Sequence, residues 1–169
     1  MKQVYVVYGA FRDVEEYREY FDIVLGYEGI TLVPLGRMPL VYKKRPALPR
    51  MIEFQLLRIS KERYRRMYLR NLRELIESRR AVFIPIDSIV CVSLKEMEIP
   101  IPPILWKPPS DPREKPARTE KVLGIHIFHE DSSRRIQLAR FFTTTKIREE
   151  LKDALKEIGV YVPRDAIDL

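Results

Sequence analysis

Apolar and polar residues alternate along much of the first half of the chain, the pattern of strands that bury one face of a sheet. Residues 14–21 interrupt this alternation and predict a short helix or a turn. Gly26 and Gly29 supply the conformational freedom that a tight turn needs. The expected strands are 4–11, two short strands within 22–36 around that turn, a continuation at 39–42, and 51–59.

The second half also alternates, and its pattern predicts strands joined by short connections. Residues 81–97 form a short strand, a break at Pro85 and a longer apolar strand. Residues 122–130 and 134–142 alternate on either side of a short polar turn, which predicts a β-hairpin.

Two segments instead place apolar residues every three or four positions, which is the periodicity of an amphipathic helix. The C-terminal segment, 145–158, follows a capping residue at Thr144 or Thr145. The other segment, 60–80, places arginines at the same spacing along a second side. We therefore expect a C-terminal amphipathic helix and an inserted basic helix.

Prolines mark a long connection between these elements. Seven of the thirteen prolines lie between Pro100 and Pro116. Because proline lacks a backbone N–H and restricts the residue before it, we expect 99–120 to be neither helix nor central strand. This Pro-rich connection either packs back onto the domain through its apolar side chains or serves as a ligand for a partner's aromatic groove. The whole chain, 1–169, is expected to form a single α+β domain.

Charge is distributed unevenly along the 169 residues, which carry a net charge of +7. Residues 1–30 hold three basic and six acidic side chains, 31–80 hold fourteen and four, and 81–169 hold fourteen of each. A localised positive field attracts nucleic acid, acidic lipid headgroups or an acidic protein partner. The single cysteine excludes an internal disulfide, and one Asn with three Gln among many charged residues gives a thermophile-like composition.

The basic block of residues 31–80 supplies the candidate binding site. Arginine's planar fork makes bidentate contacts to phosphate, and neighbouring tyrosines can stack on unpaired bases. The alternative for the same residues is a solvated face with intrahelical ion pairs, or a face that docks the acidic residues 1–30. The expected anion-contacting residues are Lys43, Lys44, Arg45, Arg66, Arg70 and Arg73, with Tyr64 and Tyr68 as base-stacking candidates.

Patterns for catalysis or metal binding are incomplete. His126 and His129 are three residues apart in an expected strand, so their rings point to opposite faces and do not share a metal. Asp87 and Lys95 superficially resemble a metal-dependent nuclease site, but Ser93 stands where a second carboxylate would bind the ion. We therefore expect no catalytic residue, no metal and no cofactor.

The order of elements in the second half carries a family resemblance. Residues 84–89 (IPIDSI) lead into a central strand, the 122–142 hairpin follows, and the 145–158 helix would cover the open end of a barrel. Residues 25–36 match a first hairpin in which a glycine precedes an apolar strand. Together these features resemble a divergent prokaryotic pleckstrin-homology-like (PH-like) domain. The resemblance implies a strongly bent antiparallel sheet or partly open barrel that binds ligands without catalysis.

We therefore predict a non-enzymatic intracellular binding or adaptor module of PH-like fold that contacts a protein or an anionic partner. The first alternative is nucleic-acid binding through residues 43–80, and the second is a metal-dependent nuclease. An acidic membrane surface and a second copy of the chain are further partners compatible with the sequence. No apolar run approaches the ~20 residues that cross a bilayer, so we expect a cytoplasmic location.

Overall fold

A computed structural model of the chain describes residues 2–40, 66, 72–78, 80–100 and 119–164. Its strands form one seven-stranded antiparallel sheet in the order β4-β3-β2-β1-β7-β6-β5, which is not closed into a barrel. The strands are β1 (Gln3–Val14), β2 (Tyr17–Gly26), β3 (Gly29–Pro39), β4 (Val82–Pro85), β5 (Ile89–Pro100), β6 (Thr119–Glu130) and β7 (Ile136–Thr143).

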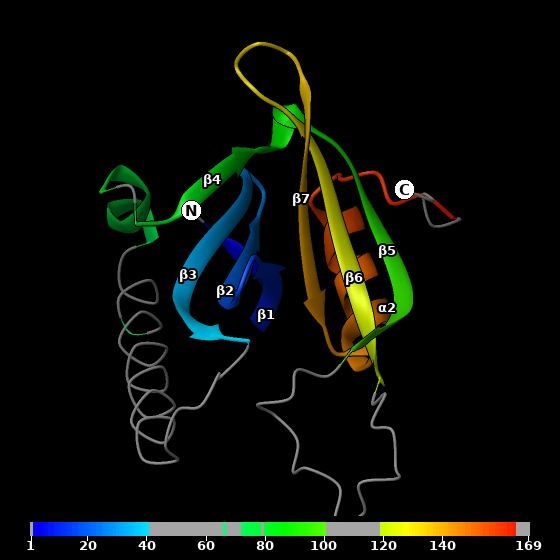
Figure 1. Cartoon of the computed structure of the whole chain (residues 1–169). Coiled ribbons are helices and arrows are strands. Elements are labelled where there is room, and N and C mark those ends of the chain that lie inside the picture. The colour runs from blue at the N-terminus through cyan, green and yellow to red at the C-terminus, as the bar shows by residue number, and fades with distance from the viewer. Residues whose placement is uncertain (1, 41–65, 67–71, 79, 101–118, 165–169) are drawn as a thin grey trace, which may run out of the picture.

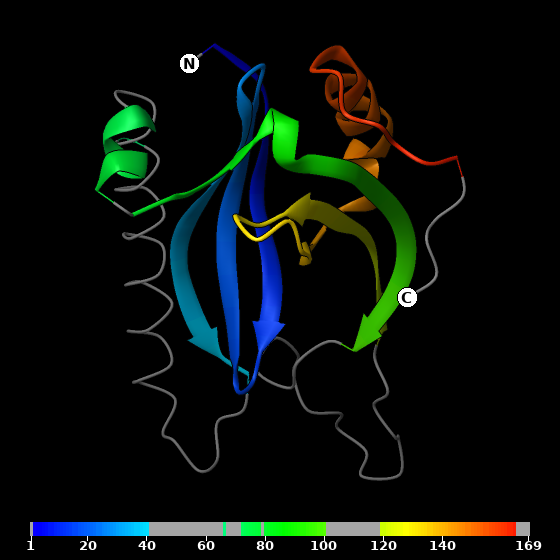
Figure 2. The ribbon, with the colours of Figure 1, turned by 90° about the horizontal axis from the view of Figure 1, so that it is seen from above.

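The sheet is strongly bent, and Figures 1 and 2 show β1–β3 on one side of the bend and β5–β7 on the other. The two halves join at a narrow seam, where β1 pairs with β7 only at Phe11 and Phe142. The two edge strands, β4 and β5, are consecutive in the chain and are linked by the short 3-10 helix η1 (Ile86–Ser88). Pro85 ends β4 and begins this turn, as the sequence predicts.

Inside the bend lies the helix α2 (Arg148–Glu157), which follows the 3-10 turn η3 (Thr145–Ile147). The predicted cap is present, because the Thr144 side chain accepts a hydrogen bond from the backbone N–H of Lys146. The apolar stripe of the helix packs against inward-facing residues of both halves of the sheet, so one core joins them. The helix contributes Leu151, Ala154, Leu155 and Ile158 to this core.

The chain after α2 returns to the edge of the sheet. Gly159 adopts a φ of 83°, which lets the chain turn away from the helix axis. Val160 is then buried in the core, and the backbone N–H of Val92 in β5 donates to the carbonyl of Tyr161 at 3.0 Å. The segment that follows the helix therefore lies along β5.

A second, smaller cluster of buried residues lies outside the main core. Residues 72–77 are helical, and Leu72 and Leu75 pack there against Val24 of β2 and Val33 of β3. These two leucines belong to the apolar stripe predicted for 60–80. The remainder of that predicted helix, other than Arg66, 78 and 80, falls outside the described residues.

The first hairpin decides between the two alternatives predicted for residues 14–21, in favour of a turn. Residues 14–21 do not form a helix, because a two-residue turn at 15–16 leads directly into β2. Glu15 adopts a φ of 54°, and Val14 pairs with Tyr17 across the turn. The expected glycine turn is confirmed, since β2 ends at Gly26 and β3 begins at Gly29.

The strands flanking the Pro-rich connection are longer than predicted. Strand β5 continues to Pro100 and β6 begins at Thr119, and these two residues pair with one another. Both ends of the 99–120 range are therefore strand: β5 tolerates Pro100 because it is an edge strand, and the β6 end, Thr119 and Glu120, contains no proline. The predicted hairpin is confirmed as β6 and β7. The predicted loop 43–50, the strand 51–59 and residues 101–118 lie outside the described residues.

One irregularity in β1 is held by a buried carboxylate. Val7 pairs with Ile23 and Ala10 with Phe21, so two residues of β1 stand opposite the single residue Asp22. Gly9 takes a φ of 67° at this bulge, and its N–H donates to Asp22 Oδ1 at 2.8 Å. The Asp22 side chain is fully buried.

Candidate ligand-binding pocket

Three charged residues form a row across the first three strands. The register places Arg12 of β1 beside Glu19 of β2, and Glu19 beside Arg37 of β3. Antiparallel pairing puts such neighbours on the same face of a sheet. The row is therefore a consequence of the two hairpin turns, which fix how the three strands align.

The central carboxylate and the aromatic rings hold the two guanidinium groups in different ways. Arg12 Nε donates to Glu19 Oε2 at 2.7 Å, and its guanidinium carbon lies 5.0 Å from the centroid of the Phe21 ring. The guanidinium of Arg37 instead lies 4.5 Å from the centroid of the Tyr17 ring. Such cation–π contacts stabilise the charge while leaving the N–H groups at its edge open to a ligand.

A cavity of about 310 Å³ lies beside this row. Its apolar wall includes Phe21, which packs edge-on against Phe141 with ring centroids 5.1 Å apart, and Pro34. Cavities of this size are at the small end of those that hold ligands. The complete lining is Arg12, Glu19, Tyr20, Phe21, Pro34, Gly36 and Arg37.

A nearby arginine, Arg18, is buried and makes its contacts within the fold rather than at the pocket. Arg18 lies on the other face of β2, where it donates to both carboxylate oxygens of Asp13 at 2.8 and 3.0 Å. Its guanidinium carbon also lies 4.0 Å from the Phe11 ring centroid, and its side chain is only 5% exposed. Burial raises the pKa of the neighbouring Tyr20 hydroxyl, and the positive charge of Arg18 opposes this rise.

The chemistry of the pocket follows from its charges. The two guanidinium groups and the single carboxylate leave one net positive charge, beside an apolar wall. A carboxylate next to an apolar group matches this arrangement better than a phosphate dianion, which would need further cations. No group of three or more His, Cys, Asp or Glu side chains in the described part of the chain is arranged to hold a metal ion.

Most of the predicted anion-binding residues cannot be compared with the structure. Lys43, Lys44, Arg45 and Arg70, together with Tyr64 and Tyr68, lie outside the described residues. Arg66 is exposed, and Arg73 is paired at 3.5 Å with Glu77, with side chains 86% and 70% exposed. Such an exposed pair contributes little to stability.

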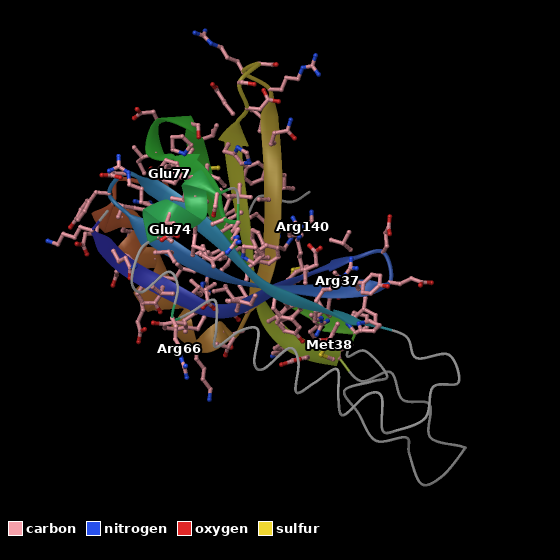
Figure 3. The ribbon with its side chains drawn as sticks, turned by 90° about the vertical axis from the view of Figure 1, so that its left-hand side faces the viewer. Arg37, Met38, Arg66, Glu74, Glu77 and Arg140 are labelled. Atoms are coloured by element: carbon pink, nitrogen blue, oxygen red, sulfur yellow. The ribbon has the colours of Figure 1, made fainter. Side chains whose placement is uncertain are left out.

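Arg37 of the basic block lines the pocket, whereas the described residues 66 and 72–78 of that block lie in a separate region. Figure 3 shows Arg66, Glu74 and Glu77 on one side of the view, with Arg37 at the far end of β3 and Arg140 on β7. Two of the predicted contact residues, Arg66 and Arg73, are therefore not gathered at the pocket.

The residues considered for catalysis or metal binding are also not gathered at one place in the structure. Asp87 lies in η1, whereas Lys95 lies midway along β5, which at ~3.3 Å per residue is roughly 20 Å further along the strand. His126 is buried and His129 is half-buried, and their separation of three positions along β6 puts the two rings on opposite faces of the sheet. Burial raises the pKa of the Cys91 thiol, which disfavours the reactive thiolate.

Comparison with known proteins finds no matching family model, no matching curated protein and no matching solved structure. The described helices include none with the length and apolar character required to cross a membrane.

The residues of the pocket could not be predicted from the sequence. Arg12, Glu19 and Arg37 are far apart in the chain, and each has the ordinary appearance of a charged residue in a strand. A signal becomes available only when the two turns are placed correctly, because the turns bring the three positions into register. The predicted helix or turn at 14–21 left that register undefined.

Proposed function

We propose that the chain is a non-enzymatic binding module with a PH-like core, and that it binds an acidic segment of a partner protein. Support for the PH-like core comes from the strand order β4-β3-β2-β1-β7-β6-β5 and from the single C-terminal helix packed inside the bend. Fold alone does not select a ligand, so the proposed binding rests on the pocket.

The observation that carries the proposal is the Arg12–Glu19–Arg37 row beside an apolar wall. Glu19 already neutralises one guanidinium, so the pocket accommodates one additional carboxylate. The wall formed by Phe21 and Pro34 suits an apolar side chain next to that carboxylate. A peptide that alternates acidic and apolar residues presents both groups together.

The first prediction is tested with such a peptide and the full-length chain. Titration with a peptide of alternating Glu and Leu, followed by NMR, should shift the backbone amides of Arg12, Gly36 and Arg37. The matched peptide with Gln in place of Glu should produce no comparable shift. Replacing Arg37→Gln should weaken binding about tenfold or more, because a charge-assisted hydrogen bond contributes about 1.5–3 kcal/mol.

The control is Arg148→Gln, which removes a half-buried arginine of α2 that pairs with Glu96 at 3.3 Å and lies outside the pocket lining. This variant should bind the peptide like the wild type. Equal affinity of the Arg37 variant and the wild type would exclude the pocket. Amide shifts at Arg66 and Arg73 on adding single-stranded DNA, without shifts from the peptide, would instead favour nucleic-acid binding through residues 43–80.

A further inference from the structure

A histidine is buried without a hydrogen-bond partner on the outer face of the second half of the sheet. His126 of β6 is 3% exposed, and neither of its ring nitrogens has a hydrogen-bond partner within the described residues. Buried polar groups are nearly always paired, so such a ring requires an explanation. Its neighbours on β6, Ile125 and Ile127, face the main core, which places His126 on the opposite face.

The ring fits closely into its surroundings. His126 pairs with Ser93 of β5 on one side and with Arg140 of β7 on the other. A Cβ atom added to Gly124 would lie 3.2 Å from His126 Nε2 and 3.2 Å from Met97 Sδ. The glycine therefore provides the space that the ring occupies, and the ring nitrogens have almost no access to solvent.

Among the described residues, the two charged side chains that face this ring are both positive. Arg140 faces it from β7 and Lys95 faces it from β5. Within the described part of the chain, Arg140 has no ion-pair partner, and Figure 3 shows its side chain on β7. Protonation would place a third positive charge beside these two, and no described group lies within hydrogen-bond distance to accept its new N–H.

We propose that His126 is a pH-sensitive lock on strands β5, β6 and β7. The neutral ring packs over Gly124 and keeps the three strands together. The protonated ring leaves this site, because it gains hydration and reduces repulsion by Lys95 and Arg140 when it reaches solvent. The outer face of these strands then loosens in mildly acidic solution, while β2 and β3 keep their structure.

The pKa of His126 in the folded protein is lowered below its usual 6.5. Burial is the main cause, and the positive charges of Arg140 and Lys95 add to it. The unfolded chain therefore takes up the proton first as the pH falls. Stability is complete above about pH 6.5 and decreases below it until the folded-state pKa is reached. Within that window the unfolding equilibrium constant rises by up to about tenfold per pH unit for one proton.

Urea unfolding from pH 8 to 5, combined with NMR titration of the imidazole resonances, tests the lock. The wild type should lose stability below pH 6.5 by more than His126→Leu, whereas His129→Gln, which changes the other histidine, should follow the wild type. Amide protection at Ile125 and Ile127 should fall at pH 5.5 relative to Ile23 and Leu25. Parallel pH profiles for the wild type and the Leu variant would overturn the proposal.

Arg140→Gln keeps the imidazole and provides a test if His126→Leu does not fold. Removing this positive charge should let His126 protonate at a higher pH than in the wild type, and loosening of β6 should begin at that higher pH. Arg148→Gln, which changes an arginine on α2, should leave the titration unchanged. A wild-type imidazole at position 126 that titrates at its usual 6.5 in the folded protein would also exclude the lock.

Discussion

At the scale of single residues, the fully buried Asp22 carboxylate fixes a local backbone shape. It accepts the N–H of Gly9 at the bulge in β1, where the strand would otherwise leave that donor without a ladder partner. A bulge of this kind bends a strand and increases its twist. We infer that this one hydrogen bond helps to set the bend of the sheet near the seam.

Asp22→Ala should therefore lower the free energy of unfolding by about 2 kcal/mol or more, because it removes a hydrogen bond to a charged group and leaves a buried N–H unpaired. Asp22→Asn should cost less, since its amide oxygen still accepts from Gly9. Urea unfolding monitored by circular dichroism measures both changes. Equal stability of the Ala variant and the wild type would show that the bulge forms without Asp22.

Residue-scale features are also where the sequence was least informative. Gly9 interrupts an apolar run, which is a recognised signal of a bulge, but nothing local identifies Asp22 as its partner. Likewise, Arg18 cannot be distinguished by pattern from Arg12 or Arg37. Only the fold shows that Arg18 is bound by Asp13 and Phe11, whereas the other two lie beside the pocket.

At the scale of elements, the helical residues 72–77 have a buried side and an exposed side, which their contacts distinguish. Leu75 is buried against the outer face of β2 and β3, while the exposed Arg73 pairs with Glu77. Helix stability in proteins comes largely from packing such an apolar stripe. The exposed side is therefore free to vary without changing how the helix docks.

Leu75→Ala should lower the free energy of unfolding by about 2–5 kcal/mol, the range for a buried leucine whose cavity cannot collapse completely. Arg73→Ala is the matched control two residues away and should leave the urea midpoint unchanged. A midpoint shift that is equal in the two variants would contradict the packing described for this helix.

Sequence patterns predict elements well where one face is buried and the other is solvated. Helix α2 follows this rule and is confirmed, and the β6–β7 hairpin is also confirmed, although β6 buries residues on both of its faces. The segment 14–21 breaks the rule, because Glu15 and Glu16 form the turn while Val14 and Tyr17 pair across it. Two-residue turns usually contain glycine or asparagine, which makes them recognisable in a sequence, and this turn contains neither.

At the scale of the whole molecule, two half-sheets share one core but meet at a single pair of residues. The rings of Phe11 and Phe142 lie across this seam with centroids 5.7 Å apart. Elsewhere along β1 and β7 the two strands diverge, so backbone hydrogen bonds contribute little to joining the halves. The aromatic pair and the α2 core are therefore the main connections.

A double-mutant cycle with Phe11→Leu and Phe142→Leu should measure this connection. We expect a coupling free energy of about 0.5–1.5 kcal/mol, the range for an aromatic pair beyond its buried area. Phe142→Leu combined with Leu75→Ala serves as the uncoupled control, since Leu75 belongs to the second cluster. A coupling near zero in both cycles would mean that the Phe11–Phe142 pair adds nothing to the connection that the shared core provides.

The segment after α2 has a consequence for how copies of this chain behave in a crowded solution. A sheet that is not closed presents two edges with unpaired backbone groups, and such edges can template addition of another chain. One edge here, β4, is only four residues long and ends in proline. The other edge, β5, is met at Val92 by the carbonyl of Tyr161 from the same chain. Each molecule thus obstructs its own longer edge, which disfavours growth of the sheet from one copy to the next.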